Sequence, residues 1–438
     1  MRRTPRRGFA TVIVLLAIAI ATVVLIDLQS SALRQATAGR EAVARVRAEW
    51  AARAGLESSI SVLGNEAELN SENVTAYQVY DALDRVAAGQ LKGVEFEVYH
   101  TEGEDERLGV ADAHVKVNVN LMSFDDLMEL VGMTEDTAAA ILDWIDEDDL
   151  VRDLGAEDGY YLQLPSPYEP RNGFIRSLLE LELVAGVRSE DVRGEDWNLN
   201  GRLDPNENDG DTTWPPDDAD GVLDAGWSEF ITAESVDVGL GISGEERLLL
   251  LDADERQLQA RVEGLDPLQA RVILDYANRE GARVEDLIGT PLVTIAQTVP
   301  GLGAPAQSVR ELEEDQLQTL IDETTVRDPD DGPAPGRLNI NTIEREVLDY
   351  VTSLSAGQAD QLIFVRDSRP EGFVGLLDLL NIIDPGTLVE LSRILDTRSN
   401  AFVVTARGRD INTGIEAEII ATIERTSLPI VITELTVR

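Results

Sequence analysis

The feature that most constrains this chain is an uncharged run from Phe9 to Ile26, which follows the basic leader MRRTPRRG. As a helix that rises 1.5 Å per residue, this run would be about 27 Å long, which is enough to cross the hydrocarbon core of a bilayer. The arginines of the leader should stay in the cytoplasm, so the chain after residue 28 should lie on the other side of the membrane. The sequence therefore predicts a single membrane-spanning helix.

A cleavable secretory signal peptide is the alternative explanation of the same run. The residues that follow it, Ile26 to Gln29, form a poor cleavage site, and the helical pattern continues beyond them. From Asp27 to Leu63, alanines and valines alternate with arginines in a span without proline, which is typical of a long amphipathic helix. We therefore expect one helix that starts in the membrane and ends in a soluble domain.

The charge and the residue types of the chain exclude several classes of function. The chain has 82 Asp and Glu against 37 Lys and Arg, which gives a net charge of -45 at pH 7. Such a polyanion repels phosphate backbones, so we expect no nucleic-acid partner. The absence of cysteine excludes disulfides and thiolate sites, and two histidines, His100 and His114, are too few for most hydrolase dyads or zinc sites. We expect no catalytic residues and no enzyme.

Strand patterns occur on both sides of a long central region. Alternating apolar and polar residues from Gly93 to Asn120 predict half-buried strands. The segment after residue 398 predicts three more strands, separated by turn signals at 409–412 and 426–429. This arrangement indicates one small antiparallel sheet that a large insertion interrupts, with the long helix packed on it.

The insertion contains an internal repeat at residues 117–145, 249–277 and 338–366. Each copy predicts a short strand, a helix cap and two helical segments around a turn, and the expected caps are Asn120, Asp252 and Asn341. These units resemble the helix-hairpin-helix motif, whose familiar use is to grip a phosphate backbone. Acidic residues open the second helix of the first copy, so we expect the repeats to build an all-α domain instead.

The densest acidic tract lies between the first two repeats, and residues 196–207, DWNLNGRLDPNE, fit the twelve-residue calcium-loop pattern. Gly201 supplies the sharp turn at position 6. Oxygen ligands at this spacing favour Ca²⁺, and carboxylates this crowded would repel one another without a cation. The predicted ligands are Asp196, Asn198, Asn200, the backbone carbonyl of Arg202, Asp204 and Glu207.

A weaker candidate lies at residues 217–224, DDADGVLD, which keeps the alternation of ligands but lacks a first ligand and a well-placed twelfth. A solvated acidic loop is the alternative for both segments. The second set of predicted ligands is Asp218, Asp220, the backbone carbonyl of Val222 and Asp224.

The N-terminus resembles that of type IV prepilin-like proteins in its basic leader, its Arg7-Gly8-Phe9 sequence and its apolar helix with an alanine-rich extension. The resemblance implies that a prepilin peptidase cuts after Gly8 and methylates Phe9. Most members carry a glutamate at the fifth mature position, which here is Ile13. That carboxylate neutralises the N-terminus of the subunit above it, because an unpaired carboxylate in hydrocarbon is costly. Ile13 therefore predicts a subunit with nothing above it, at the tip of a filament.

The run from Asp143 to Val187, the sequence LNINT and the missing glutamate resemble minor pseudopilin K of type II secretion systems, over nearly the whole chain. The resemblance implies an α+β fold, in which a pilin-like long N-terminal helix packs on a small antiparallel β-sheet. A large, mostly α-helical domain of helix-hairpin-helix-like repeats would be inserted into this sheet. The resemblance also implies bound calcium, but the ligands proposed at 196–207 rest on the loop pattern alone.

The same resemblance implies a place and a set of partners. The protein would be a minor pseudopilin at the tip of the type II secretion pseudopilus, and would initiate or cap its assembly for protein export across the outer membrane. The expected partners are other minor pseudopilins, the inner-membrane assembly platform, the prepilin peptidase and the membrane itself. The expected location is the bacterial inner membrane, which the chain crosses once, with its bulk in the periplasm.

Two other functions fit parts of the sequence. One is a pilus or DNA-uptake component that binds nucleic acid with the helix-hairpin-helix units, and the other is a calcium-dependent adhesin with an uncut leader. The predicted domains are a leader at 1–8, a transmembrane helix at 9–28, its periplasmic continuation at 29–64, the first pilin-like strands at 65–116, the inserted α-helical domain at 117–398 with its acidic calcium loop at 195–229, and the closing strands at 399–438.

Overall fold

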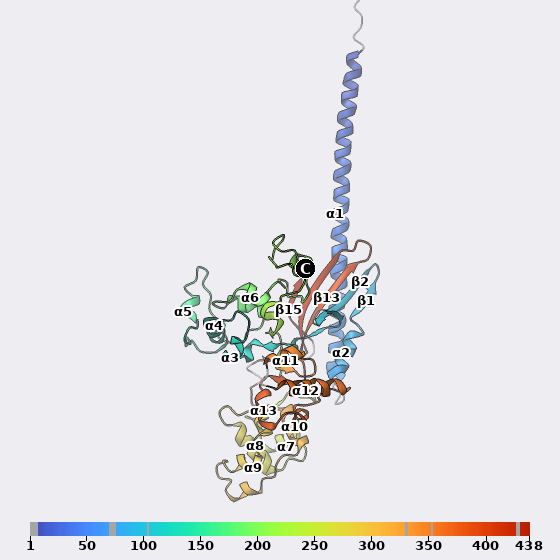
Figure 1. Ribbon diagram of the computed structural model, residues 1–438. Coiled ribbons are helices and arrows are strands. Elements are labelled where there is room, and N and C mark those ends of the chain that lie inside the picture. The colour runs from blue at the N-terminus through green and yellow to red at the C-terminus, as the bar shows by residue number, and fades with distance from the viewer. Residues whose placement is uncertain (1–7, 70–75, 103–104, 329–331, 352–353, 426–429) are drawn as a thin grey trace, which may run out of the picture.

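The long N-terminal helix stands out from the rest of the protein as a stem (Figure 1). The computed structural model describes residues 8–69, 76–102, 105–328, 332–351, 354–425 and 430–438. Helix α1 runs without a break over Gly8–Leu69, and its first half is apolar, exposed and long enough to cross a membrane. Residues 1–7 of the predicted leader (1–8) lie outside the described residues. Helix α1 begins at Gly8, the last residue of that leader, and Phe9 follows it. The prediction of one continuous helix is confirmed.

The stem ends on a seven-stranded antiparallel sheet, built from both ends of the chain. The strand order is β1-β2-β13-β14-β15, with β3 paired to β2 and β4 paired to β13. The prediction of one sheet interrupted by an insertion is therefore confirmed. The strands are β1 (Ala88–Leu91), β2 (Val94–Glu102), β3 (Asp105–Leu108), β4 (Ala111–Asp112), β13 (Ala401–Asp410), β14 (Glu416–Glu424) and β15 (Val431–Val437).

One face of the sheet is apolar and carries α1. Phe402, Val404 and Ala406 alternate along β13 and are buried with their cross-strand partners on β14. Helix α1 covers them with small residues such as Ala52, because only a small side chain lets a helix approach a sheet closely. The approach is closest at Gly408, where an added Cβ would overlap the backbone oxygen of Ala48.

The opposite face of the sheet is polar. Arg407 of β13 places its guanidinium 4.5 Å from the centre of the Tyr99 ring, and it also forms ion pairs with Glu97 and Glu106. The hydroxyl of Tyr99 donates a hydrogen bond to the carboxylate of Glu418 on β14. This face is therefore suited to contacts with a polar, charged neighbour, and part of the inserted domain meets it.

The region 65–116 contains a helix that the strand pattern did not predict. Helix α2 (Ala76–Asp84) precedes β1, and its Val79 and Leu83 pack into the same core as Leu56 of α1. Its i, i+4 pair of apolar residues is too short a signal to distinguish a helix from a strand in the sequence. Burial against α1 therefore decides the local structure.

The insertion lies between β4 and β13 and has one hydrophobic core of its own, which extends from Val117 to Leu395. Its α-helices are α3 (Phe124–Met128), α4 (Glu135–Ile145), α5 (Asp158–Tyr161), α6 (Ser189–Arg193), α7 (Glu255–Arg261), α8 (Pro267–Ala277), α9 (Leu292–Ala296), α10 (Glu314–Glu323), α11 (Arg345–Val351), α12 (Ala356–Ser368) and α13 (Pro385–Leu391). Short 3-10 segments join them: η1 (Ala113–Val115), η2 (Val119–Leu121), η3 (Leu178–Leu183), η4 (Pro205–Glu207), η5 (Gly226–Glu229), η6 (Val284–Ile288), η7 (Ala304–Ser308) and η9 (Leu376–Asn381).

Each repeat begins at one strand of a short parallel pair, whose partner strand lies outside the repeat, and contains two helices in contact. The helices are α3 with α4, α7 with α8, and α11 with α12, at the places that the repeat predicts. Their relation to the helix-hairpin-helix motif stays a prediction. The parallel pairs are β5 (Val117–Asn118) with β6 (Ile231–Thr232), β8 (Leu248–Leu249) with β9 (Thr324–Thr325), and β11 (Leu338–Asn339) with β12 (Leu395–Asp396), and β7 (Val236–Asp237) pairs with β10 (Ala334–Pro335) in antiparallel fashion.

The predicted helix caps were wrong. Ser123 caps α3 and Asp254 caps α7, where Asn120 and Asp252 were expected. Asn120 instead holds a distant segment, since its side chain accepts a hydrogen bond from the backbone N–H of Ile175 at 2.7 Å and donates one to its carbonyl at 2.9 Å. Asn341 does the same with Phe373, at 2.8 and 2.9 Å. These contacts are possible because an asparagine side chain offers a donor and an acceptor side by side.

The contact between α1 and β13 predicts a large effect of one methyl group. Gly408→Ala should destabilise the protein by about 1–3 kcal/mol, because the helix must move away from the sheet. Gly39→Ala is the control, since a Cβ at Gly39 meets nothing within 4 Å, and it should stabilise α1 slightly. Thermal unfolding of the detergent-solubilised chain measures both, and equal melting temperatures for Gly408→Ala and the wild type would contradict the close contact.

Candidate metal centre

The predicted calcium loop begins after α6 and folds as a tight turn. The carboxylate of Asp196 accepts hydrogen bonds from the backbone N–H groups of Asn200, at 3.0 Å, and Gly201, at 2.8 Å. Gly201 has a φ of 70°, which a residue without a Cβ adopts at little cost. The loop therefore makes its sharp bend at the position that the pattern predicts.

The side chains at positions 3 and 5 of the loop follow the same pattern. The side-chain oxygen of Asn198 accepts from the N–H of Asn200 at 2.9 Å, and that of Asn200 accepts from the N–H of Arg202 at 2.8 Å. Each is a turn in which a side chain binds the backbone two residues later. The turns direct the oxygens of Asp196, Asn198 and Asn200 to the inside of the loop.

The last two predicted side-chain ligands close the loop. One oxygen of Asp204 accepts from the amides of Asn198, at 2.7 Å, and Asn200, at 3.1 Å. Glu207 accepts from the backbone N–H groups of Trp197, at 3.1 Å, and Asp204, at 3.0 Å. The guanidinium of Arg202 pairs with the other oxygen of Asp204, at 3.1 Å from its Nε atom. The structure thus brings all of the predicted first-loop residues together.

Burial makes this cluster electrostatically unusual. Asp196 is 2% exposed and Glu207 is 1% exposed. The pKa of Glu207 is raised to about 7, mainly by burial and in part by the nearby carboxylates of Asp196 and Asp204. Burial also raises the pKa of Asp196, although the ammonium of Lys116 opposes this effect. Burial disfavours the charged form of a carboxylate, and binding of either a proton or a cation relieves this cost.

The donor set suits a hard cation such as Ca²⁺, since it consists of carboxylate and amide oxygens. Counting only carboxylates and imidazoles, no group of three within the described ranges is gathered tightly enough to hold a metal ion. The amide oxygens of Asn198 and Asn200 and the carbonyl of Arg202 would therefore have to complete the coordination. With those oxygens included, the residues present fit the cation.

The second predicted loop is arranged differently. Asp218 accepts from the N–H of Asp220 at 3.0 Å, Asp220 from that of Val222 at 2.7 Å, and Asp224 from that of Gly226 at 2.9 Å. All four predicted ligands of this loop are exposed. Successive turns at the surface account for these contacts, so cation binding at Asp218, Asp220, Val222 and Asp224 stays a prediction.

A third acidic cluster, which the sequence analysis did not single out, lies after α4. Asp143 is fully buried, Glu157 is 2% exposed, and Asp146 lies beside them. Both carboxylate oxygens of Glu157 are without a hydrogen-bond partner among the described residues, whereas Arg152 pairs with Asp143 at 2.9 Å. Burial, followed by the charge of Asp143, raises the pKa of Glu157 to about 7. The dense carboxylates of the runs IDEDDL and GAED could have indicated this cluster.

The predicted calcium loop meets the polar face of the sheet. A Cβ at Gly201 would lie 3.3 Å from the hydroxyl of Thr101 on β2. The positive charge of Arg202 acts on Tyr99 of β2, and the charge of Glu418 on β14 acts on Arg202. The loop therefore lies where the inserted domain touches the sheet.

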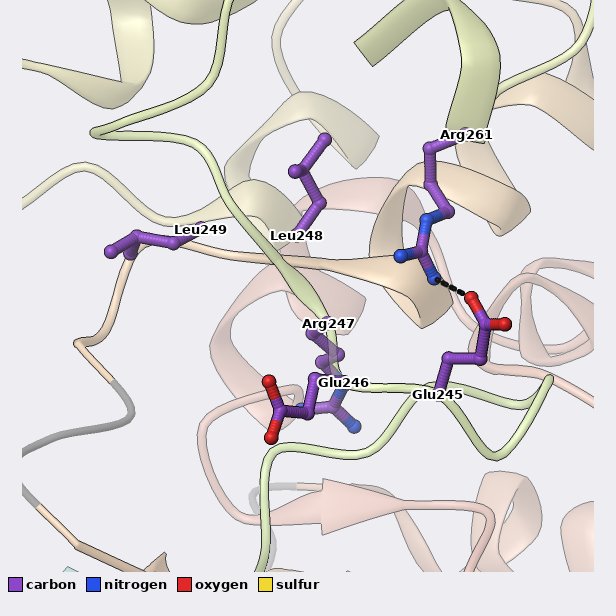
Figure 2. Close-up of a pocket in the computed structure, with 6 residues that line it drawn as sticks. All are labelled: Glu245, Glu246, Arg247, Leu248, Leu249 and Arg261. Carbon is purple, nitrogen blue, oxygen red and sulfur yellow. Dashed lines mark ion pairs between the residues drawn. The ribbon is translucent and has the colours of Figure 1, made fainter. Parts of the chain in front are cut away.

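An open cavity of about 620 Å³ lies elsewhere in the insertion, along Glu245 to Leu249 and beside Arg261 (Figure 2). Its arginines already have acidic partners: Arg261 pairs with Glu323 at 2.9 Å and with Glu245 at 3.7 Å, and Arg247 pairs with Asp237 at 2.8 Å. The described lining therefore offers charged groups that are already compensated, and no constellation for catalysis.

Comparison with known proteins identifies the segment around the third acidic cluster. Residues 106–194 match the family model for the first domain of type II secretion system protein K. Over this segment the chain is similar in sequence to that family. This match confirms the predicted resemblance to that family, whose members are components of a secretion system. The segment contains Asp143 and Glu157 and ends before the predicted calcium loop at 196–207.

Two individual proteins are similar to the chain. A type II secretion system protein K from Pectobacterium carotovorum subsp. carotovorum is 32% identical over 89 residues, which are 20% of this chain and 27% of that protein. The chain thus aligns with about a quarter of the length of this curated relative. The crystal structure of the GspK-GspI-GspJ complex from the enterotoxigenic Escherichia coli type 2 secretion system contains a chain with 13% identity and a TM-score of 0.44. That match covers 93% of this chain and 99% of the other.

The buried carboxylates predict a stability that depends on pH. Because the folded pKa of Glu207 is raised from 4.5 to about 7, its contribution is present below pH 4.5 and is lost as the pH rises through 7. In EDTA, the melting temperature should therefore fall over this window, and Glu207→Gln should remove part of the fall. Glu157→Gln should remove another part, since that pKa is also about 7. The same pH profile for Glu207→Gln and the wild type would contradict the burial of a titrating carboxylate.

Proposed function

We propose that this chain is a minor pseudopilin at the tip of a type II secretion pseudopilus, where it initiates or caps the assembly that exports proteins across the outer membrane. The observation that carries the proposal is the combination of three parts in one chain. The second half of a membrane-length helix packs on a pilin-like sheet, and a large insertion interrupts this sheet. The segment similar to secretion protein K begins in β3 and extends into the insertion. A stem with a sheet on its end is the form of a subunit that stacks through its helix.

Two features support the position at the tip, namely Ile13 in the stem and the bulk of the inserted domain. Ile13 lies in the apolar part of α1 and is 51% exposed, so nothing there can neutralise the ammonium of a subunit above. The inserted domain adds bulk beside the sheet (Figure 1). A subunit of this shape can pack on other subunits below it. Its inserted domain hinders its own burial within a helical stack of subunits.

The chain acts in this proposal as an assembly protein and not as an enzyme. It is inserted in the bacterial inner membrane by a single helix, with its bulk in the periplasm. Its partners are other minor pseudopilins, the inner-membrane assembly platform and the prepilin peptidase. Nucleic-acid binding by the helical repeats has no comparable support, because Glu135 and Asp136 open α4 in a chain of net charge -45.

Calcium has a structural role in the proposal. Asp196, Asn198, Asn200, Asp204, Glu207 and the carbonyl of Arg202 would hold one Ca²⁺. The cation would offset the cost of burying the carboxylates of Asp196 and Glu207, whose pKa values burial raises. It would thereby stabilise the loop on Thr101 and its neighbours in β2.

Calorimetric titration with CaCl₂ tests this site. Asp196→Ala combined with Glu207→Ala should abolish one binding event, because two buried charged ligands are lost. Asp218→Ala combined with Asp220→Ala is the matched control and tests the exposed loop separately. If the first double variant takes up calcium as the wild type does, the assignment of these ligands fails.

The N-terminus provides the direct test of the function. Mass spectrometry of the membrane-bound protein should find a mature chain that begins with methylated Phe9, because prepilin peptidase is the enzyme that cuts such leaders. An intact leader that begins at Met1 would support the adhesin alternative and end the pseudopilin proposal.

Ile13→Glu tests the position at the tip. A carboxylate at residue 13 gives the stem the partner group that a subunit above requires, so the variant should appear along the fibre as well as at its end. Ile13→Gln is the matched control, which is polar but uncharged. Immunogold labelling of isolated fibres measures the distribution, and regular labelling along the shaft by the wild type would already exclude a tip subunit.

A further inference from the structure

The apolar face of the sheet continues beyond the part that α1 covers. Edge strand β15 places Leu435 opposite Ala421 and Val437 opposite Ile419. The two β14 residues are 0% and 3% exposed, because they lie in the core beneath α1. Leu435 and Val437 are 50% and 47% exposed, although cross-strand partners share one face. The core of the sheet thus has an uncovered margin.

A β-bulge enlarges this margin. The pairing with β14 shifts between Thr422 and Ile423, so that Ile432 lies opposite Ile423. Without the extra residue, Ile432 and Leu435 would point to opposite faces, because side chains alternate along a strand. With it, Ile432, Leu435 and Val437 all lie on the side that carries α1, and Ile432 is 41% exposed. We call these three residues the β15 apolar margin.

The dimensions of the margin match a second helix. Helix α1 lies over β13, with β2 and β14 on either side, and touches the β13 backbone at Gly408. Strands are spaced by about 4.8 Å, so β15 is about 10 Å from β13. Packed helices lie about 8–10 Å apart. A helix placed beside α1 on the same face would therefore lie directly over β15.

We propose that the β15 apolar margin is the docking site for the long N-terminal helix of a second, different prepilin-like subunit, which lies alongside α1. This inference rests on the proposed function and names the surface that such a partner uses. A second copy of this chain is disfavoured, because it would bring together two chains that each carry a net charge of -45. An extended strand would pair with the edge of β15 and leave the margin on its face uncovered.

Charge on α1 adds a requirement for the partner. Leu56 packs in the cluster that contains Ile419 and Ile423 of β14, whereas Ala54 packs against Val94 and Phe96 of β2. Arg45 lies eleven residues before Leu56, which is three helical turns, so it is on the β14 side of α1 and is exposed. Glu49 lies one turn after Arg45 on the same side and is also exposed, so the docked helix should carry an acidic group opposite Arg45 and a basic group opposite Glu49.

Site-specific photo-crosslinking tests the proposal in the full chain, expressed in its own bacterium with the other secretion subunits. The probe is p-benzoylphenylalanine at position 435. The expected result is an adduct whose peptide maps to the N-terminal helix of another subunit with a prepilin leader. Position 436 is the matched control, because Thr436 lies on the opposite face of β15, and it should give little of this adduct.

A third probe separates failure of this inference from failure of the proposed function. Trp50 is 65% exposed on α1, so a probe there reports any neighbouring pseudopilin helix. Adducts at position 50 without adducts at position 435 would overturn the docking site and leave the pseudopilin function intact. An adduct at 435 with a second copy of this chain, or with an extended segment of a partner, would also overturn it.

Substitution provides a quantitative check. Leu435→Glu should lower co-purification of the cross-linked partner subunit at least about tenfold, since a charge would be buried beneath the docked helix. The melting temperature of the chain alone should stay within about 2 °C of the wild type, because the side chain is half exposed. Thr436→Glu is the matched control and should leave co-purification unchanged. Equal co-purification of Leu435→Glu and the wild type contradicts the proposal.

Discussion

The contact between α1 and the central strand β13 is the constraint on which the rest of the structure depends. Gly408 and Ala48 let a helix backbone come against a strand, and the buried residues of β14 and β2 complete that core on either side. This contact joins the first sixty residues of the chain to the last forty. The residues between β4 and β13 therefore form one long loop whose two ends are held together by the sheet. The entropic cost of closing such a loop grows only slowly with its length. A large insertion is tolerated provided that it folds around a core of its own, as the insertion does.

The insertion holds its repeats together with buried polar contacts as well as apolar ones. Arg337 donates to Glu285 at 2.8 Å and to Asp396 at 2.6 Å, and so links η6 to β12. Burial opposes the charged form of Asp396, yet Arg337 holds the pKa of that carboxyl below its usual range. Asn120 and Asn341 each bind a remote backbone segment by the same two hydrogen bonds. Such directional contacts fix which repeat meets which segment, whereas apolar packing alone is tolerant of sliding.

Periodic features could be predicted from the sequence, and features that depend on remote partners could not. The length of the apolar run, the alternation in the strands and the fixed spacing of Asp196 to Glu207 are local signals, and they gave the stem, the sheet and the shape of the candidate loop. The caps at Asn120 and Asp252 were wrong because the competing partner, such as the Ile175 backbone, lies far away in sequence. The cluster at Asp143 and Glu157 was missed for a similar reason. Its residues become unusual only when folding buries them and leaves the carboxylate of Glu157 without a hydrogen-bond partner in the described part of the chain.

The topology of the sheet also sets an order of events during export. In the proposed single-span topology, the residues directly after the membrane helix cross first, so the second half of α1, β1 and β2 arrive long before β13, which forms the middle of the sheet. Until residues 401–424 have emerged, the part of α1 that packs on β13 and β14 is uncovered, and the edge of β2 that pairs with β13 has no partner strand. The inserted domain, whose hydrophobic core ends at Leu395, can fold before β13 arrives. Translation that stops before β13 would therefore leave a folded inserted domain next to an incomplete sheet. Truncation of the last forty residues would remove β13, β14 and β15, and with them most of the surface on which α1 packs.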